Sequence, residues 1–240
     1  MVAPRQMVPP RQLAAAARSI LSCPDDVNLV VDGVDELLAD RDELGMVDRD
    51  GSPVLACPAG SPLAAAASEG RSALLTVSSG LGPRDSQSRD ARLTLAGRLT
   101  VAAREDCECC GEERVQVAID LNFVLLSRTP PGEPEQQYRV PLDHFASPDL
   151  RLNRGFLQRS VEHANDCHQD ELRRAMAMTS GTRMSDIVGV RLAALQPHQV
   201  DVTWVDIDGA HSRTVEFGRS ARSAEELGEL LRARLHAGLC

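Results

Sequence analysis

Histidine and cysteine side chains gather in one stretch of the chain, between positions 157 and 178. His163 and Cys167 are four residues apart, whereas His168 follows His163 by five. On a regular helix, residues four apart share a face and residues five apart do not. A chelating pair would therefore be His163 with Cys167, and not the two histidines. The alternative is that His163 and Asn165 are partly buried polar groups that tie the helix to a sheet.

A second group of thiols comprises Cys107, Cys109 and Cys110, in the segment REDCECCGEE. The acidic neighbours raise the pKa of a thiol, which argues against an activated nucleophile, although a bound metal would reverse this effect. The spacing C-x-C-C also lacks the usual C-x-x-C knuckle of a zinc site. We expect an exposed, dispensable loop between two strands, with a metal site as the alternative.

The composition excludes several classes of function. The 240 residues carry a net charge of −9, all 26 basic residues are Arg, and the aromatic share is 2%. An acidic chain with dispersed Arg and few stacking rings argues against nucleic-acid binding. The lack of Lys excludes a lysine Schiff base and a P-loop lysine. No apolar run approaches the ~20 residues that span a bilayer, and no signal peptide is recognisable, so we expect a cytoplasmic protein with no membrane contact.

The part of the chain before the histidines is rich in strands. Residues 1–12 are expected to form a disordered arm, and residues 13–150 a first domain that begins with a helix over Gln12–Ser22. Alternating apolar and polar residues predict long strands, with a small helix at Ser61–Glu69 and a bulge or bend at Gly97. The main strands are predicted at Asn28–Gly33, Pro53–Cys57, Arg71–Ser78, Ala91–Ala103, Arg114–Leu126 and Tyr138–Leu142. This pattern predicts a closed antiparallel barrel.

Residues 151–240 are expected to form a second, smaller domain. One long amphipathic helix over Leu157–Met178, with Ser160 as its N-cap, opens this domain. A closing helix is predicted over Ser223–Ala237, because Ser223 and Glu226 form a capping box. Three strands are predicted between the helices, at Asp186–Leu195, Gln199–Asp206 and Ser212–Gly218. The result is a two-layer α-β-β-β-α domain, which makes the whole chain α+β.

Two parts of the sequence resemble a known family. The segment HANDCHQDEL from His163, the strands around Val188-Gly189-Val190 and Val202–Asp206, and the closing helix resemble the small C-terminal domain that accompanies bacterial and plastid split barrels. The segment TLAGRLT at Thr94–Thr100 resembles a strand of the pyridoxamine-phosphate-oxidase-like, FMN-binding split barrel. The chain departs from the family at Ala164, where methionine is favoured, and at Cys167, where an acidic residue is usual.

The resemblance implies a homodimeric, bacterial split barrel of the haem-utilisation group, followed by the small domain. Such a protein would bind haem or a related tetrapyrrole, and as an enzyme it would open haem oxidatively. The family's axial histidine lies in a tail without a counterpart here. The candidate axial ligands are therefore His163 and His168 by motif, His236 by position and His144 after the last barrel strand. We favour His163, because Glu162, Asn165 and Asp166 stand nearby as orienting groups.

Two alternatives to haem binding follow from the same residues. A flavin-dependent oxidoreductase would bind the FMN phosphate through Arg71 and Arg84, although the absence of Lys and the few aromatic rings count against it. A regulatory or scaffold dimer would be non-enzymatic and need no ligand. Each of these expectations includes a homodimer, because a barrel with few large side chains tends to bury an exposed strand face against a second copy.

Overall fold

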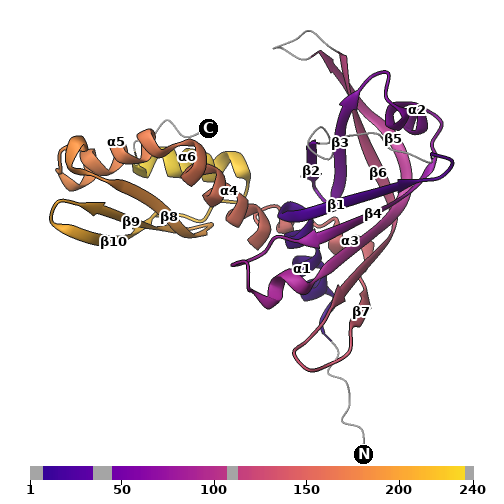
Figure 1. Cartoon of the computed structure of the whole chain (residues 1–240), viewed down its shortest axis with the longest axis horizontal. Coiled ribbons are helices and arrows are strands. Elements are labelled where there is room, and N and C mark those ends of the chain that lie inside the picture. Colours follow the sequence, from indigo (N-terminus) through magenta and orange to yellow (C-terminus); the bar gives the residue numbers. More distant parts are fainter. Residues whose placement is uncertain (1–7, 35–44, 107–112, 236–240) are drawn as a thin grey trace, which may run out of the picture. The chain divides into compact units, whose positions relative to one another are not determined.

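The computed structural model describes residues 8–34, 45–106 and 113–235, which form a mixed α+β protein. The chain divides into two units, Met1–Leu150 and Arg151–Cys240, and each is described by itself. Within the described residues, every helix is too short or too polar to cross a bilayer. Figure 1 labels the elements of both units.

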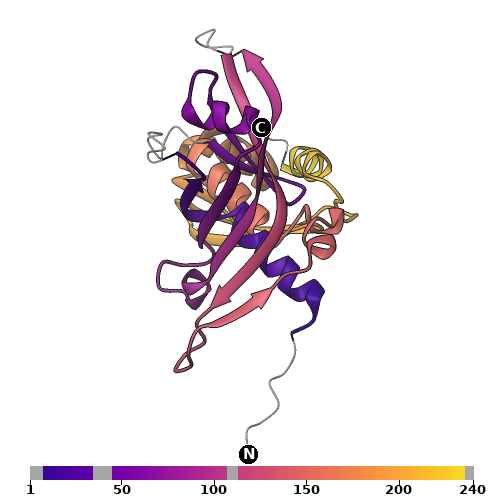
Figure 2. The same cartoon turned by 90° about the vertical axis from the view of Figure 1, so that its right-hand side faces the viewer.

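The first unit is built on a curled antiparallel sheet (Figures 1 and 2). The strands run in the order β1-β4-β5-β6-β3-β2, and β7 also pairs with β6. They are β1 (Pro24–Val31), β2 (Gly45–Arg49), β3 (Ser52–Pro58), β4 (Ser72–Ser79), β5 (Arg92–Asp106), β6 (Glu113–Arg128) and β7 (Gln136–Arg139). Among the described residues, the edge strands β1 and β2 do not pair with each other. In the part of the chain that the structure describes, the sheet is therefore a curled half-barrel, and the predicted closed barrel is not confirmed.

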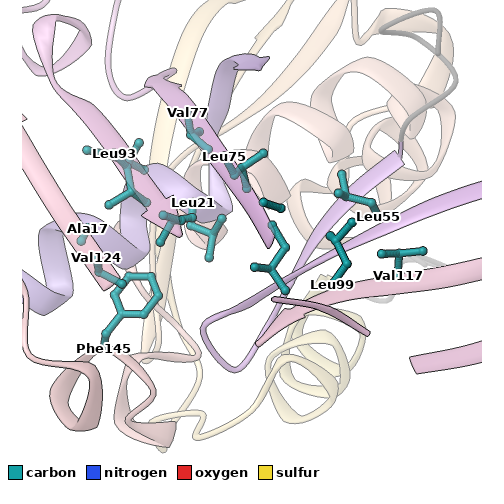
Figure 3. Packing of buried hydrophobic residues seen from close by; sticks show 14 of the residues in the cluster. Ala17, Leu21, Leu55, Leu75, Val77, Leu93, Leu99, Val117, Val124 and Phe145 are labelled. Carbon is teal, nitrogen blue, oxygen red and sulfur yellow. The ribbon is translucent and has the colours of Figure 1, made fainter. Parts of the chain in front are cut away.

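Short helices accompany this sheet, and three α-helices among them contribute buried residues to its core. They are α1 (Pro10–Ser22), α2 (Pro62–Ser68) and α3 (Leu142–Phe145), with the short 3-10 helices η1 (Gln87–Asp90) and η2 (Pro148–Leu150). Ala17 and Leu21 of α1 are buried in the same core as Leu75 and Leu93 of the sheet (Figure 3). Alanine-rich α1 lets its backbone approach the sheet closely, so small side chains fill a core that contains few rings.

The first unit contains a tight turn at Asp50-Gly51 and the predicted bulge at Gly97. The Asp50-Gly51 hairpin joins β2 to β3, and both of its residues have positive φ, at 51° and 93°. Such angles suit the Asp-Gly pair of a tight hairpin. The bulge at Gly97 is also present, because the register between β5 and β6 shifts between Ala96 and Gly97.

The second unit is a three-stranded antiparallel sheet in the order β10-β9-β8, with helices on one face (Figure 1). Its elements are α4 (Arg154–Cys167), α5 (Gln169–Ser180), η3 (Met184–Asp186), β8 (Gly189–Gln196), β9 (Gln199–Asp206), β10 (Gly209–Glu216) and α6 (Ala224–Leu235). Val190 and Leu192 of β8 and Val200 and Val202 of β9 point into the core beneath the helices, at 4% exposure or less. The alternation of these strands was correctly predicted.

The single long helix predicted over Leu157–Met178 is wrong. The helix starts earlier, because Asn153 is the N-cap and its side chain accepts a hydrogen bond from the backbone of Phe156 at 3.0 Å. Ser160 lies inside the helix and donates to the carbonyl of Phe156. The helix also ends at Cys167, since His168 has non-helical angles of φ −122° and ψ 34°. At the other end of the unit, Ser223 accepts from the backbone of Glu226 at 3.2 Å, as the capping box predicted.

Candidate functional site

The interruption at His168 brings two imidazoles together at the junction of α4 and α5. The Nε2 atoms of His163 and His168 lie 3.3 Å apart. Their ring centroids are 5.1 Å apart, and the ring planes meet at 79°. In a regular helix, these side chains would point about 140° apart around the axis. The expectation that His168 points elsewhere is therefore wrong, because the backbone leaves the helical path at this residue.

The two imidazoles differ in their surroundings. His163 is exposed, whereas only 12% of the His168 side chain is accessible. On the far side of the His168 ring, Nδ1 lies 3.9 Å from the Oε2 atom of Glu171. A hydrogen bond between two Nε2 atoms requires a proton on one and a lone pair on the other. A neutral imidazole is a good ligand for iron and for other transition metals.

The helix junction is held by side chains that bind the backbone of β8. The Asn165 amide donates to the carbonyl of Leu192 at 3.0 Å and accepts from its N–H at 2.8 Å. Gln169 donates to the carbonyl of Val190 at 3.0 Å. Asn165 thus ties the helix to the sheet, as the sequence allowed. These bonds fix the backbone on both sides of His168 and so hold the two imidazoles in place.

A second polar cluster was missed by sequence reasoning, which expected His211 to be solvated at a strand end. His211 on β10 lies directly opposite Trp204 on β9, and their rings stack with centroids 5.0 Å apart. The Nε2 atom of His211 is 2.8 Å from Oδ1 of Asp206, and the Trp204 indole donates to Oδ2 at 3.3 Å. The chain turns at Ile207 and Asp208, with Asp206 opposite Gly209. A turn centred on Asp208-Gly209 would have placed His211 opposite Asp206, so the sequence signal does not give the contact with Trp204.

The Asp206 carboxylate is buried, with 4% of its side chain exposed. Its pKa lies below the ordinary value of 3.8, chiefly because His211 hydrogen-bonds to it, and the Asp208 N–H and the Trp204 indole act in the same direction against the effect of burial. The cluster also borders a cavity of about 720 Å³ that crosses the three strands. Asp206 therefore organises the β9–β10 hairpin as an anion.

The lowered pKa of Asp206 gives a prediction for stability against pH. A carboxyl whose pKa is lower in the folded state stabilises the protein above the unfolded-state pKa, and this contribution disappears as the pH falls through the folded-state pKa. We therefore expect Asp206→Asn to destabilise most near neutral pH, and to approach wild-type stability in acid. Urea unfolding at several pH values measures this difference. The exposed-site variant Asp170→Asn is the control, and a wild-type advantage that persists in strong acid would contradict the prediction.

The remaining candidate residues lie elsewhere. His144 is half-buried in α3 of the first unit. Arg71 precedes β4, donates to the carbonyls of Asp32 and Gly33 and pairs with Glu69 at 2.6 Å. Arg84 is exposed beyond the other end of β4, a strand of 8 residues. Such a strand is about 27 Å long, so the structure does not bring these two arginines to one phosphate. Cys107, Cys109, Cys110 and His236 lie outside the described residues.

Comparison with known proteins gives neither a family nor a function. No family model matches the chain, and no curated protein matches its sequence. Among solved structures, a heme binding protein from Mycobacterium smegmatis is 15% identical over 96% of this chain and 98% of that chain, with a TM-score of 0.39. A protein of unknown function from Agrobacterium tumefaciens is 16% identical over 98% of this chain and 100% of that chain, with a TM-score of 0.40. TM-scores this low do not establish a shared fold or function, so the function is inferred from the geometry of the site itself.

Proposed function

We propose that this protein is a split barrel of the haem-utilisation type that binds haem or a related tetrapyrrole, with His163 as the axial ligand. The observation that carries the proposal is the imidazole pair at the α4–α5 junction. It combines an exposed ring at His163 with a largely buried ring at His168, whose Nε2 atom lies 3.3 Å from Nε2 of His163. Haem proteins commonly use such an imidazole, positioned by a neighbouring group, to hold the iron.

The side chains around His163 fit this group in two respects. The ring of His163 is exposed, so a porphyrin could reach its Nε2 atom once the contact with His168 is released. Arg159 lies four residues earlier on the same helix face, where its exposed guanidinium can pair with a propionate. The iron would supply the oxygen and redox chemistry when bound, and the protein's part is to hold and orient it.

We expect haem added to the purified protein to give a Soret band that depends on His163. His163→Ala should shift or abolish this band without changing the circular dichroism spectrum, because the exposed ring contributes little to folding. His211→Ala is the matched control, since it removes an imidazole of the same unit that is already engaged by Asp206. A band that survives in His163→Ala and is lost in His211→Ala or His144→Ala would move the site. If the wild-type protein gave no Soret band with haem, haem binding would be ruled out and the regulatory or scaffold role would be favoured.

We also propose that the protein is a homodimer that pairs through the convex face of the half-barrel. An apolar row crosses four strands there, because Val30 lies opposite Leu74, Leu74 opposite Ala96, and Ala96 opposite Phe123. Val30 is 56% exposed and Leu74 43% exposed, which is unusual for large apolar residues on neighbouring strands. A second copy would remove this row from water.

The dimer proposal predicts that Leu74→Glu gives a monomer. A charge in the middle of the apolar row would be buried without a partner in the dimer, which costs several kcal/mol. Light scattering at micromolar concentration measures the mass of both proteins. Met178→Glu, at a 70% exposed position of the second unit, is the control and should leave the mass unchanged. A monomeric wild type would contradict the proposal.

A further inference from the structure

We propose that His163 and His168 together chelate a bare divalent transition-metal ion of the Zn²⁺ or Co²⁺ type. The two Nε2 atoms are 3.3 Å apart. An ion that lies ~2.05 Å from each of them makes a nitrogen–metal–nitrogen angle of ~107°. This is close to the tetrahedral angle that such ions adopt with imidazole ligands. The present spacing of the two Nε2 atoms thus suits a shared metal ion with little movement of either ring.

The surroundings of the pair favour a ligand role. Glu171 Oε2 lies 3.9 Å from the Nδ1 atom of His168, on the side of the ring away from His163. At this distance the carboxylate makes no hydrogen bond to the ring, but it places a negative charge near a bound cation. Asn165 and Gln169 hold the backbone on both sides of His168 through bonds to β8. The chelate is therefore preorganised by the fold, which reduces the entropy lost on binding.

The site has two protein ligands among the described residues, where no group of three His, Cys, Asp or Glu side chains is placed to hold a metal. Water would complete the coordination of the ion. Cys167 is exposed at the same junction, but its thiol is not required by this geometry. The inference thus reverses the pairing predicted from the sequence, in which His163 and Cys167 would be the chelating residues.

Chelation also limits how the pair can serve haem. A porphyrin leaves its iron two axial positions on opposite sides of the ring, so one iron cannot accept two imidazoles that are about 107° apart. Haem would use one imidazole only, whereas the bare ion uses both. Only this competition rests on the proposed function, and a divalent ion bound at the pair would exclude haem from His163.

The test is titration of the haem-free full chain with Co²⁺ and Zn²⁺, by calorimetry and by the visible absorption of tetrahedral Co²⁺. We expect His163→Ala and His168→Ala each to abolish one bound ion per chain or to weaken it about tenfold or more. Cys167→Ser and the exposed-site variant His198→Ala should bind as the wild type does. Circular dichroism confirms that each variant is folded.

Three results would overturn the inference. In the first, both histidine variants bind the metal as the wild type does. In the second, Cys167→Ser no longer binds the ion. In the third, only one of the two histidine variants loses the ion. Because no haem is present, none of these results bears on the Soret test. The proposed function and the metal site can therefore fail independently.

Discussion

Replacing Arg18 with alanine is expected to lower the free energy of unfolding by about 3–5 kcal/mol. The Arg18 side chain is 2% exposed, and its Nε donates to Oδ2 of Asp48 at 3.0 Å, where the carboxylate is 7% exposed. A second donor, Nη1, binds the carbonyl of Phe145 at 2.9 Å. One guanidinium thus joins α1, β2 and α3.

The size of the effect follows from what the substitution leaves behind. Asp48 keeps its hydrogen bonds from Ser22 at 2.7 Å and from the Gly51 N–H at 2.8 Å, so it stays in the core. Without Arg18, this carboxylate is a buried charge with no counter-ion, and the Phe145 carbonyl loses a donor. The loss of stability comes mainly from these two buried groups left without a partner, because an intact buried ion pair contributes little net stability.

The chain offers a matched control for this prediction on the same helix. Arg11 of α1 pairs with Asp149 at 2.9 Å, but its side chain is 72% exposed and that of Asp149 67% exposed. Arg11→Ala should cost at most about 1 kcal/mol, as exposed ion pairs do. Urea unfolding followed by circular dichroism measures both variants. Equal losses for Arg11→Ala and Arg18→Ala would show that burial does not determine the effect.

The elements of the fold were largely visible in the sequence, because their periodicity is local. The strands of the half-barrel, the Asp50-Gly51 turn and the bulge at Gly97 all follow from alternation and turn chemistry. The open edges of the half-barrel were not visible, since they depend on which strands pair across the sheet. Arg18 was hidden for the same reason, because its partner Asp48 lies 30 residues away and nothing local marks this arginine as buried.

The candidate site was only half predictable. His163 and His168 were singled out by residue type, but their contact requires the backbone to leave the helix at His168. The amphipathic pattern continues on both sides of this point, so the periodicity does not reveal the interruption. His211 was missed for a similar reason. A turn centred on Asp208-Gly209 would place it opposite Asp206, whereas the chain turns one residue earlier, at Ile207 and Asp208, and places it opposite Trp204.

Gly97→Ala is expected to destabilise the first unit by about 3 kcal/mol. A Cβ atom at Gly97 would lie 2.1 Å from the carbonyl oxygen of Asp120 and 2.7 Å from its carbonyl carbon. These are backbone atoms of the neighbouring strand β6, which cannot rotate away as a side chain does. The alanine fits only if β5 and β6 separate at the bulge, and this breaks the ladder through the middle of the half-barrel. Thermal and urea unfolding of the full chain measure the loss.

A strand glycine without such a neighbour separates this contact from the general effect of adding a methyl group. Gly189 opens β8, and a Cβ atom there would meet no heavy atom within 4 Å. Gly189→Ala should therefore be neutral or stabilise by about 0.4–1 kcal/mol, because alanine restricts the unfolded chain more than glycine does. The difference in unfolding free energy between the two variants measures the effect of the close contact with the Asp120 backbone. If Gly97→Ala proved as well tolerated as Gly189→Ala, β5 and β6 would have to lie further apart at the bulge than the structure places them.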